Sequence, residues 1–126
     1  MTNLFSATIW GRAFTLPIVY DCYGNKAIEP EQLEAMKSFS LHLDWIEKAK
    51  AQVEAYCTDC VRQDDSNQKK DNIFSYVMPR SIFVIRDKKQ PRVALMCRYK
   101  YDPEHDLAIV FSLDGHATVC PQDTVL

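Results

Sequence analysis

Glycine is scarce in this sequence, which contains only Gly11, Gly24 and Gly115 among its 126 residues. A phosphate-binding loop needs several closely spaced glycines so that the backbone can approach the ligand, and such a loop is therefore excluded. The Gly-x-Ser-x-Gly and His-Glu-x-x-His patterns of hydrolases and metalloproteases are also missing. The favoured expectation is a protein without cofactor, metal ion or catalytic residue.

The sequence also lacks an excess of charge of either sign. Fifteen Lys and Arg face seventeen Asp and Glu, for a net charge of −2, which creates no field that would attract nucleic acid or acidic lipid. No apolar run approaches the roughly 20 residues that span a bilayer. Residues 1–10 lack the basic start and the apolar stretch of a signal peptide. We expect a cytoplasmic protein that binds neither nucleic acid nor membrane directly.

The five cysteines cannot form a complete set of disulfides, and a cytoplasmic chain keeps its thiols reduced. Cys57-x-x-Cys60 has the spacing of a zinc or redox pair. A structural zinc site needs a second pair of ligands, which the sequence does not offer. Both cysteines continue the apolar stripe of a predicted helix, so we interpret them as buried thiols.

The apolar fraction of 47% and the length fit one domain that covers residues 1–126. The segment 62–71, "RQDDSNQKKD", contains no apolar residue. It is expected to be a solvated, disordered loop that links two halves of this domain.

The first half of the chain predicts two strands and two helices. Strands at 4–9 and 13–20 flank a tight turn at Gly11, and Pro17 predicts an edge position or a bulge in the second strand. The first helix begins at Pro30 and is expected to end at Ser40, which would cap the next. The second helix covers 41–61. Its predicted buried stripe consists of Ile46, Ala49, Val53, Tyr56, Cys57 and Cys60.

The second half predicts four strands, "SIFVIRD", "RVALMCRYKY", "LAIVFSL" and "HATVC". Lys88–Pro91 and Asp114-Gly115 are hairpin signals between them. The order is thus two strands, two helices and four strands. This favours an α+β fold in which an antiparallel sheet of about five to six strands carries the helix pair on one face.

One of these strands carries aromatic and basic residues. Because strand side chains alternate, Tyr99 and Tyr101 share a face with Cys97, while Arg98 and Lys100 lie on the other. Basic and aromatic groups on a sheet can bind nucleic-acid bases. The slightly acidic composition argues against that function here.

The stretch "YDPEHDLAIVF", residues 101–111, concentrates the reactive side chains. Glu104, His105 and Asp106 suit proton transfer or metal binding, with His105 as base or ligand and a carboxylate orienting it. Asp102-Pro103, however, begins a turn, and charged loops commonly close hairpins. The turn is the favoured interpretation. A small hydrolase or metal-dependent enzyme that uses Glu104, His105 and Asp106 remains the alternative.

The C-terminal sequence "DPEHDLAIVFSLDGHATVCPQDTVL" resembles the signature of a family of small bacterial proteins catalogued as a domain of unknown function. That signature is an aromatic strand, Asp-Pro-Glu-His-Gly, a small-apolar strand, a hairpin and a closing Pro-Gln-Asp. The N-terminal half, including "AIEPEQLEAMKSF", is similar too. This chain has Asp106 where the pattern favours Gly. If that Gly adopts a positive φ, Asp is among the better-tolerated replacements.

Proteins of this type resemble immunity proteins of polymorphic or contact-dependent growth-inhibition toxins. The resemblance implies that the chain binds and neutralises a cognate toxin domain, such as a nuclease, without catalysis; its oligomeric state is left open. A plain scaffold or oligomeric adaptor is a third alternative. Since such toxins are often basic, exposed acids would favour the encounter. The candidate partner-binding residues are Asp59, Asp64, Asp65, Asp71, Asp102, Glu104 and Asp106. Within the turn, we expect Glu104 and His105 to brace it, and Asp102 and Asp106 to face the partner.

Overall fold

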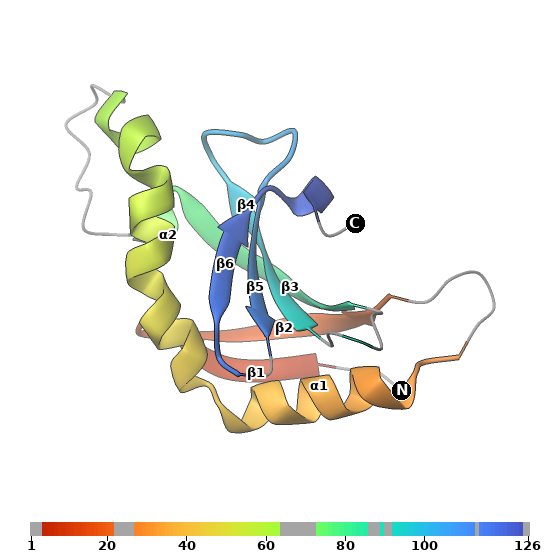
Figure 1. Ribbon diagram of the computed structural model, residues 1–126. Helices are drawn as coiled ribbons and strands as arrows, with labels where there is room; N and C mark the ends of the chain where they lie inside the picture. Colours follow the sequence, from red (N-terminus) through yellow and green to blue (C-terminus); the bar gives the residue numbers. More distant parts are fainter. Residues whose placement is uncertain are drawn as a thin grey trace.

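The computed structural model describes residues 4–21, 27–63, 73–85, 89, 92–112 and 114–124; the side chains of 58–63 and of residue 75 are not described. A six-stranded sheet carries two helices (Figure 1). The elements are β1 (Leu4–Ile9), β2 (Arg12–Tyr20), α1 (Pro30–Leu41), α2 (Asp44–Gln63), η1 (Ile73–Ser75), β3 (Val77–Ile85), β4 (Arg92–Tyr99), β5 (Leu107–Ser112), β6 (Ala117–Cys120) and η2 (Gln122–Thr124). The predicted α+β class and element order are confirmed.

The strands follow one another across the sheet in the order β1-β2-β3-β4-β5-β6. Neighbouring strands are antiparallel except for β2 and β3, which run parallel. The prediction of an antiparallel sheet is therefore wrong for this one pair. Parallel neighbours need a long crossover connection, and α1 and α2, which separate β2 from β3 in the sequence, provide it.

Strand β2 changes its pairing partner halfway along. Residues 12–17 pair with β1, and residues 18–20 pair with β3. Pro17 is the last residue paired with β1, opposite Leu4, and lies just before the pairing with β3 begins. Proline has no N–H for a second ladder. The strand is not at the edge of the sheet, but its proline occupies a position that pairs on one side.

The β1–β2 hairpin is anchored to the start of α2 by a tryptophan. Trp10 and Gly11 have φ angles of 49° and 87°, as the two central residues of a type I′ hairpin turn require. The indole Nε1 of Trp10 donates to the carbonyl of Ile46 at 2.9 Å, and its backbone N–H donates to Glu47 Oε1 at 3.0 Å. The predicted turn at Gly11 is confirmed, and these bonds explain why a bulky residue tolerates a left-handed conformation.

A buried amide fixes the beginning of α1, which starts at Pro30 as predicted. Gln32 is 1% exposed. Its Oε1 accepts a hydrogen bond from the Glu29 N–H at 2.8 Å, and its Nε2 donates to the carbonyls of Asp21 at 2.9 Å and Val84 at 3.2 Å. Buried amides are stable only when such partners exist. Gln32 thus joins α1 to the ends of β2 and β3.

The boundary between the helices differs from the prediction. Leu41 ends α1 and α2 begins at Asp44. Ser40 does not cap α2, because its hydroxyl donates to the Met36 carbonyl inside α1 at 2.9 Å.

In α2, four members of the predicted stripe are buried, Ile46, Ala49, Val53 and Cys57. Tyr56 is 41% exposed, because it projects about 100° away from Cys57 around the helix. The side chain of Cys60 is not described. Apart from residues 62 and 63 in α2, the predicted loop at 62–71 also lies outside the described part of the chain.

The two faces of the sheet have different cores. Helix and strand residues together form the larger one, which includes Phe39, Ile46, Leu95 and Phe111. The described residues of the smaller one all come from strands: Ile85, Ala94, Met96, Ala108 and Val110, with Phe83 and Cys120 packed against them. The helices therefore cover one face, as predicted, and we call the other the helix-free face. No helix within the described ranges is both long and apolar enough to cross a membrane.

Candidate functional site

The turn between β4 and β5, residues 100–106, closes on its own backbone. The last ladder pair before it joins Cys97 to Leu107. The Asp102 N–H donates to the Tyr99 carbonyl at 3.3 Å. The Asp102 carbonyl in turn accepts the N–H groups of His105 at 3.3 Å and Asp106 at 2.7 Å. The sequence "YDPEHD" is therefore a compact, hydrogen-bonded turn, as the favoured interpretation predicted.

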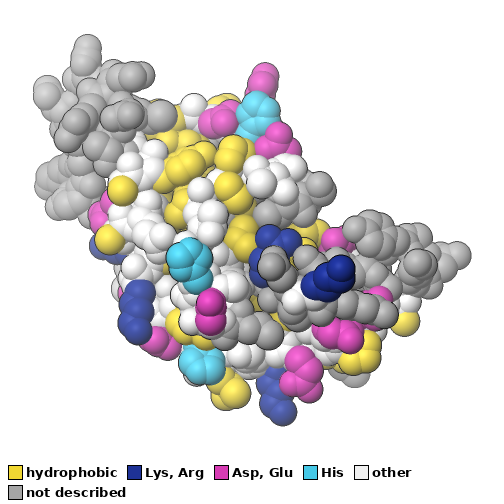
Figure 2. Space-filling model, viewed as in Figure 1, with side chains coloured by type: hydrophobic (Ala, Val, Ile, Leu, Met, Phe, Trp, Pro, Cys, Tyr) yellow, Lys and Arg dark blue, Asp and Glu magenta, His cyan; other side chains and the backbone are white. Residues whose placement is uncertain are grey.

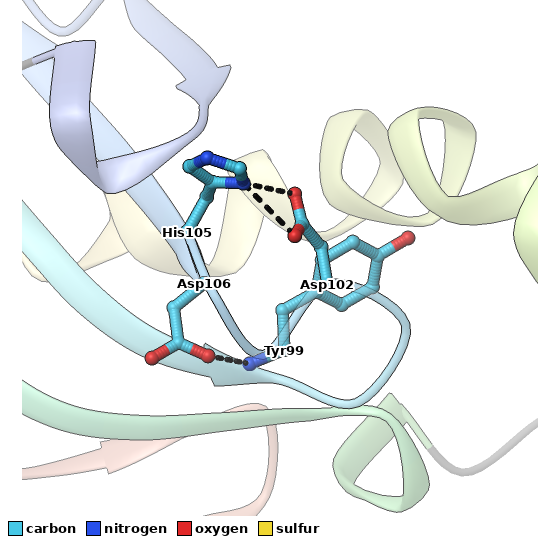
Figure 3. A network of polar contacts seen from close by, with 4 residues as sticks. All are labelled: Tyr99, Asp102, His105 and Asp106. Carbon is cyan, nitrogen blue, oxygen red and sulfur yellow. Dashed lines mark hydrogen bonds and ion pairs between the residues drawn. The ribbon is translucent and has the colours of Figure 1, made fainter.

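Asp106 holds the exit of this turn. Its φ is 53°, in the left-handed region that glycine, asparagine and aspartate adopt most readily. Its Oδ1 accepts a hydrogen bond from the Tyr99 N–H at 3.0 Å (Figure 3). The expectation of a free Asp106 carboxylate is wrong, since this group braces the turn. Glycine would also adopt this positive φ without strain.

His105 and Asp102 form an exposed ion pair at the tip of the turn. The Nδ1 of His105 lies 3.0 Å and 3.2 Å from the two carboxylate oxygens of Asp102 (Figure 3). The hydrogen bond with Asp102 and then its negative charge raise the pKa of His105 above its usual value. Glu104 is exposed and has no hydrogen-bond partner among the described residues. It does not brace the turn, contrary to expectation.

A C-terminal glutamine clamps the turn from outside. The Nε2 of Gln122 donates to the carbonyls of Cys97 at 3.0 Å and Leu107 at 3.3 Å, and its backbone N–H donates to the His105 carbonyl at 3.1 Å. These contacts satisfy carbonyls where the β4–β5 ladder ends. The motif "CPQD" is the only sequence signal for this clamp, and the sequence alone did not assign it.

The three residues of the enzyme alternative, Glu104, His105 and Asp106, have separate surroundings, and the carboxylate that orients His105 is that of Asp102. The Asp106 carboxylate binds a backbone N–H, His105 turns toward Asp102, and Glu104 points to solvent. The described residues include no group of three or more His, Cys, Asp or Glu side chains that could hold a metal ion. The turn is built to keep one shape and to present Glu104 and the Asp102–His105 pair outward.

Four tyrosines gather at the turn, and we call them the tyrosine cluster: Tyr56 of α2, Tyr76 between η1 and β3, Tyr99 at the end of β4 and Tyr101 of the turn itself. Tyr99 lies 6.2 Å from Tyr56 and 5.8 Å from Tyr101 between ring centroids, and Tyr101 lies 6.3 Å from Tyr76. Tyr76 and Tyr99 are buried, Tyr101 is half-buried and Tyr56 is exposed. Burial raises the pKa of Tyr76 to about 12. Figure 2 shows hydrophobic side chains gathered between α2 and the turn, with acidic and histidine side chains at the upper edge.

A hollow of about 320 Å³ opens next to this cluster. Its lining consists of four apolar or aromatic residues, two cations and a proline of the turn: Phe74, Tyr76, Met78, Tyr99, Arg98, Lys100 and Pro103. The hollow is large enough to receive an aromatic side chain, one of the residue types that most often anchor protein interfaces.

The remaining candidate acids are distributed differently. The backbone of Asp59 lies in α2, but its side chain is not described. Asp64, Asp65 and Asp71 lie outside the described residues. The turn thus brings together Asp102, Glu104 and Asp106 among the seven candidates.

The other histidines and the described cysteines have structural surroundings. His42 caps the end of α1 and stacks on Trp45 with ring centroids 4.6 Å apart, and His116 is an exposed residue of the β5–β6 turn. Cys57 and Cys97 are fully buried, and burial raises the pKa of the Cys97 thiol well above its usual range. Such thiols are unreactive.

Comparison with known proteins adds a family but no activity. No curated protein and no solved structure matches the chain. Residues 3–126 match a family described as a domain of unknown function, DUF6985. Since the match covers nearly the whole chain, the protein belongs to this family of domains of unknown function.

Proposed function

We propose that this protein is an immunity-type inhibitor, which binds a cognate toxin domain and blocks it without catalysing a reaction. The observation that carries the proposal is the rigid acidic turn between β4 and β5. Its backbone groups, Asp106 and Gln122 are occupied in holding its shape, whereas Glu104 and the Asp102–His105 pair remain exposed. A surface that is already ordered loses less conformational entropy when it binds.

The tyrosine cluster supports a protein partner. Tyrosine is enriched among the residues that dominate interface energies, because its ring buries a large area and its hydroxyl still makes hydrogen bonds. Tyr56 exposes 41% of its surface close to the turn. In this proposal the exposed tyrosine rings and the adjacent hollow supply the apolar centre of the interface, and the acids of the turn supply its charged rim.

The charges of the rim specify the partner. Exposed Asp102 and Glu104 would attract a basic surface, such as the active-site region of a nuclease, and would speed the encounter. Complementary charge at a rim changes the association rate more than the dissociation rate.

The test uses the toxin-like domain encoded beside this gene. We expect co-expression of the protein to restore growth of cells that produce this domain. Calorimetry should give a one-to-one complex with a Kd of about 1 nM. Tyr56→Ala should weaken the complex by about 1–2 kcal/mol. Glu104→Gln should slow association and reduce its dependence on salt.

Two surface variants serve as controls. Leu41→Ala removes an apolar residue at the end of α1 that is even more exposed than Tyr56, and Glu34→Gln removes an exposed acid on α1. Neither should change the Kd. A protein that neither binds the neighbouring toxin domain nor restores growth would contradict the proposal.

A further inference from the structure

The helix-free face of the sheet contains a second cavity, which shares only Arg98 and Pro103 with the described lining of the hollow beside the tyrosine cluster. The site forms at an irregularity in the pairing of β3 with β4, where Pro79 pairs with Cys97 and Ser81 pairs with Met96. Arg80 is therefore an extra residue, a β-bulge, inserted where proline cannot donate a ladder hydrogen bond. Met96 belongs to the helix-free core, so its partner Ser81 lies on that face. Because successive side chains of a strand point to opposite faces, Arg80, which follows Pro79, also lies on the helix-free face.

A second arginine meets the bulge from the neighbouring strand. Along β4, Ala94 and Met96 lie on the helix-free face, and Arg98 follows at the next position of the same alternation. Arg80 and Arg98 line a cavity of about 470 Å³. This volume falls within the roughly 300–1,000 Å³ that is typical of small-molecule sites.

The cavity combines an apolar surface with unpaired positive charge. Phe83 and Met96 line it between the strands, and Val19 of β2, which is 48% exposed, adds an apolar edge. Arg80 and Arg98 are both exposed, and the guanidinium group of neither has a hydrogen-bond or ion-pair partner among the described residues.

Asp106 supplies the only acidic side chain among the described lining residues. One of its carboxylate oxygens already accepts the Tyr99 N–H. Two arginines therefore face one partly engaged carboxylate, and the cavity has an excess of positive charge although the whole chain is slightly acidic.

We propose that this cavity binds a small amphipathic anion, a carboxylate attached to an apolar body of about the size of a phenylalkyl group. The two guanidinium groups of Arg80 and Arg98 would bind the carboxylate through charge-assisted hydrogen bonds. The apolar body would rest on Phe83 and Met96 and displace water from them. Tyr99 belongs to the larger core on the opposite face of β4 and does not line this cavity.

The test titrates the full chain with phenylbutyrate and follows it by heteronuclear NMR. We expect saturable shift changes at the backbone amides of Phe83, Met96 and Arg98 and at the side-chain Nε–H of Arg80. Arg80→Gln and Arg98→Gln should each weaken binding about tenfold or more, as loss of a charge-assisted hydrogen bond implies. Phenylbutanamide, which lacks the charge, and acetate, which lacks the apolar body, should each bind at least about tenfold more weakly.

Lys37→Gln is the matched control, because Lys37 is an exposed cation on α1, over the opposite face of the sheet. It should bind phenylbutyrate like the wild type. Because both arginines are exposed, their variants should unfold at the wild-type denaturant concentration. Absence of saturable shifts, equal binding of acid and amide, or equal binding by Arg98→Gln would each overturn the proposal. The outcome is independent of the toxin experiment, since no partner protein is present.

Discussion

The position of Asp106 requires both a residue that tolerates a positive φ and a side chain that accepts a hydrogen bond. Its backbone has a φ of 53°, and its carboxylate accepts the Tyr99 N–H at 3.0 Å. Glycine would tolerate the positive φ but offers no acceptor, and alanine would satisfy neither requirement. We predict that Asp106→Asn changes the free energy of unfolding least, since asparagine tolerates this φ and retains an acceptor oxygen. Asp106→Gly should lower the free energy of unfolding by about 1 kcal/mol, because the hydrogen bond is lost. Asp106→Ala should lower it by about 1–2 kcal/mol more, because alanine does not tolerate the left-handed backbone.

Urea denaturation of the three variants measures this order. Glu104→Ala is the control, because Glu104 is an exposed neighbour in the same turn, and it should leave the unfolding free energy within about 0.5 kcal/mol of wild type. An Asp106→Ala protein as stable as Asp106→Asn would show that neither the φ nor the hydrogen bond matters.

His105 makes the same turn sensitive to pH. Its pKa is raised from 6.5, first by the hydrogen bond with Asp102 and then by the charge of that carboxylate. A raised folded-state pKa stabilises the fold fully below the unfolded value, and the contribution is lost as pH rises through the folded value. We predict that Asp102→Asn lowers the His105 pKa and removes this pH dependence. Titration of the imidazole protons by NMR measures the pKa.

The matched control for this titration is Glu104→Gln. Glu104 contributes least among the causes that raise the His105 pKa, so its substitution should lower the pKa less than Asp102→Asn does. A larger effect from Glu104→Gln would mean that general negative charge, rather than the Asp102 hydrogen bond, controls the histidine.

At the scale of elements, substitutions at two glycines allow the cost of backbone strain to be measured separately from the cost of a packing clash. Gly11 and Gly115 both have a φ of 87°, but a Cβ at Gly11 would meet nothing within 4 Å, whereas one at Gly115 would lie 2.7 Å from Nε1 of Trp45. We predict that Gly11→Ala costs about 1–2 kcal/mol of unfolding free energy from the left-handed backbone alone. Gly115→Ala should cost at least about 1 kcal/mol more, because the β5–β6 hairpin packs directly against α2.

A double-mutant cycle with Trp45→Ala measures the packing part of this cost. Removing the indole removes the clash, so in the Trp45→Ala protein the Gly115→Ala substitution should cost no more than Gly11→Ala. If the excess cost persists without Trp45, the hairpin does not meet α2 through this contact.

The elements that the sequence predicted correctly are those with local causes. Pro30 begins a helix and Asp114-Gly115 forms a hairpin turn because the required backbone angles belong to the residues themselves. The parallel pairing of β2 with β3 and the Gln122 clamp have no such local cause. Gln122 lies 25 residues from Cys97 in the sequence, and only the completed fold brings them together.

The candidate site shows the same division. The sequence identified the β4–β5 turn and its acids, since Asp-Pro and the charged residues between apolar strands are local signals. It correctly expected His105 to brace the turn, where the ring bonds Asp102, but it chose Glu104 rather than Asp106 as the second bracing residue. That choice depends on which carboxylate reaches the Tyr99 N–H. The bulge at Pro79 and its cavity depend on strand register, which the sequence does not state.

At the scale of the whole molecule, the β1–β2 hairpin is joined to the rest of the sheet by fewer pairs of residues than the other strands are joined to one another. Strands β3, β4 and β5 pair along nearly their full lengths, interrupted by the bulge at Arg80. The β1–β2 hairpin is paired with them only through residues 18–20 of β2. Its other described hydrogen bonds to the rest of the fold include the two from Trp10 to α2. The hairpin is therefore expected to open locally before the rest of the sheet does.

Native-state hydrogen exchange tests this difference. We predict that the amides of β1 exchange through a lower opening free energy than those of β4. Trp10→Phe removes the indole donor to Ile46, a loss of about 1 kcal/mol, and should accelerate exchange in β1 about fivefold. Trp45→Phe is the matched control, because Trp45 contacts the β5–β6 hairpin, and it should leave exchange in β1 unchanged. Equal protection of β1 and β4 would instead mean that the three pairs of β2 with β3 suffice to make the sheet one cooperative unit.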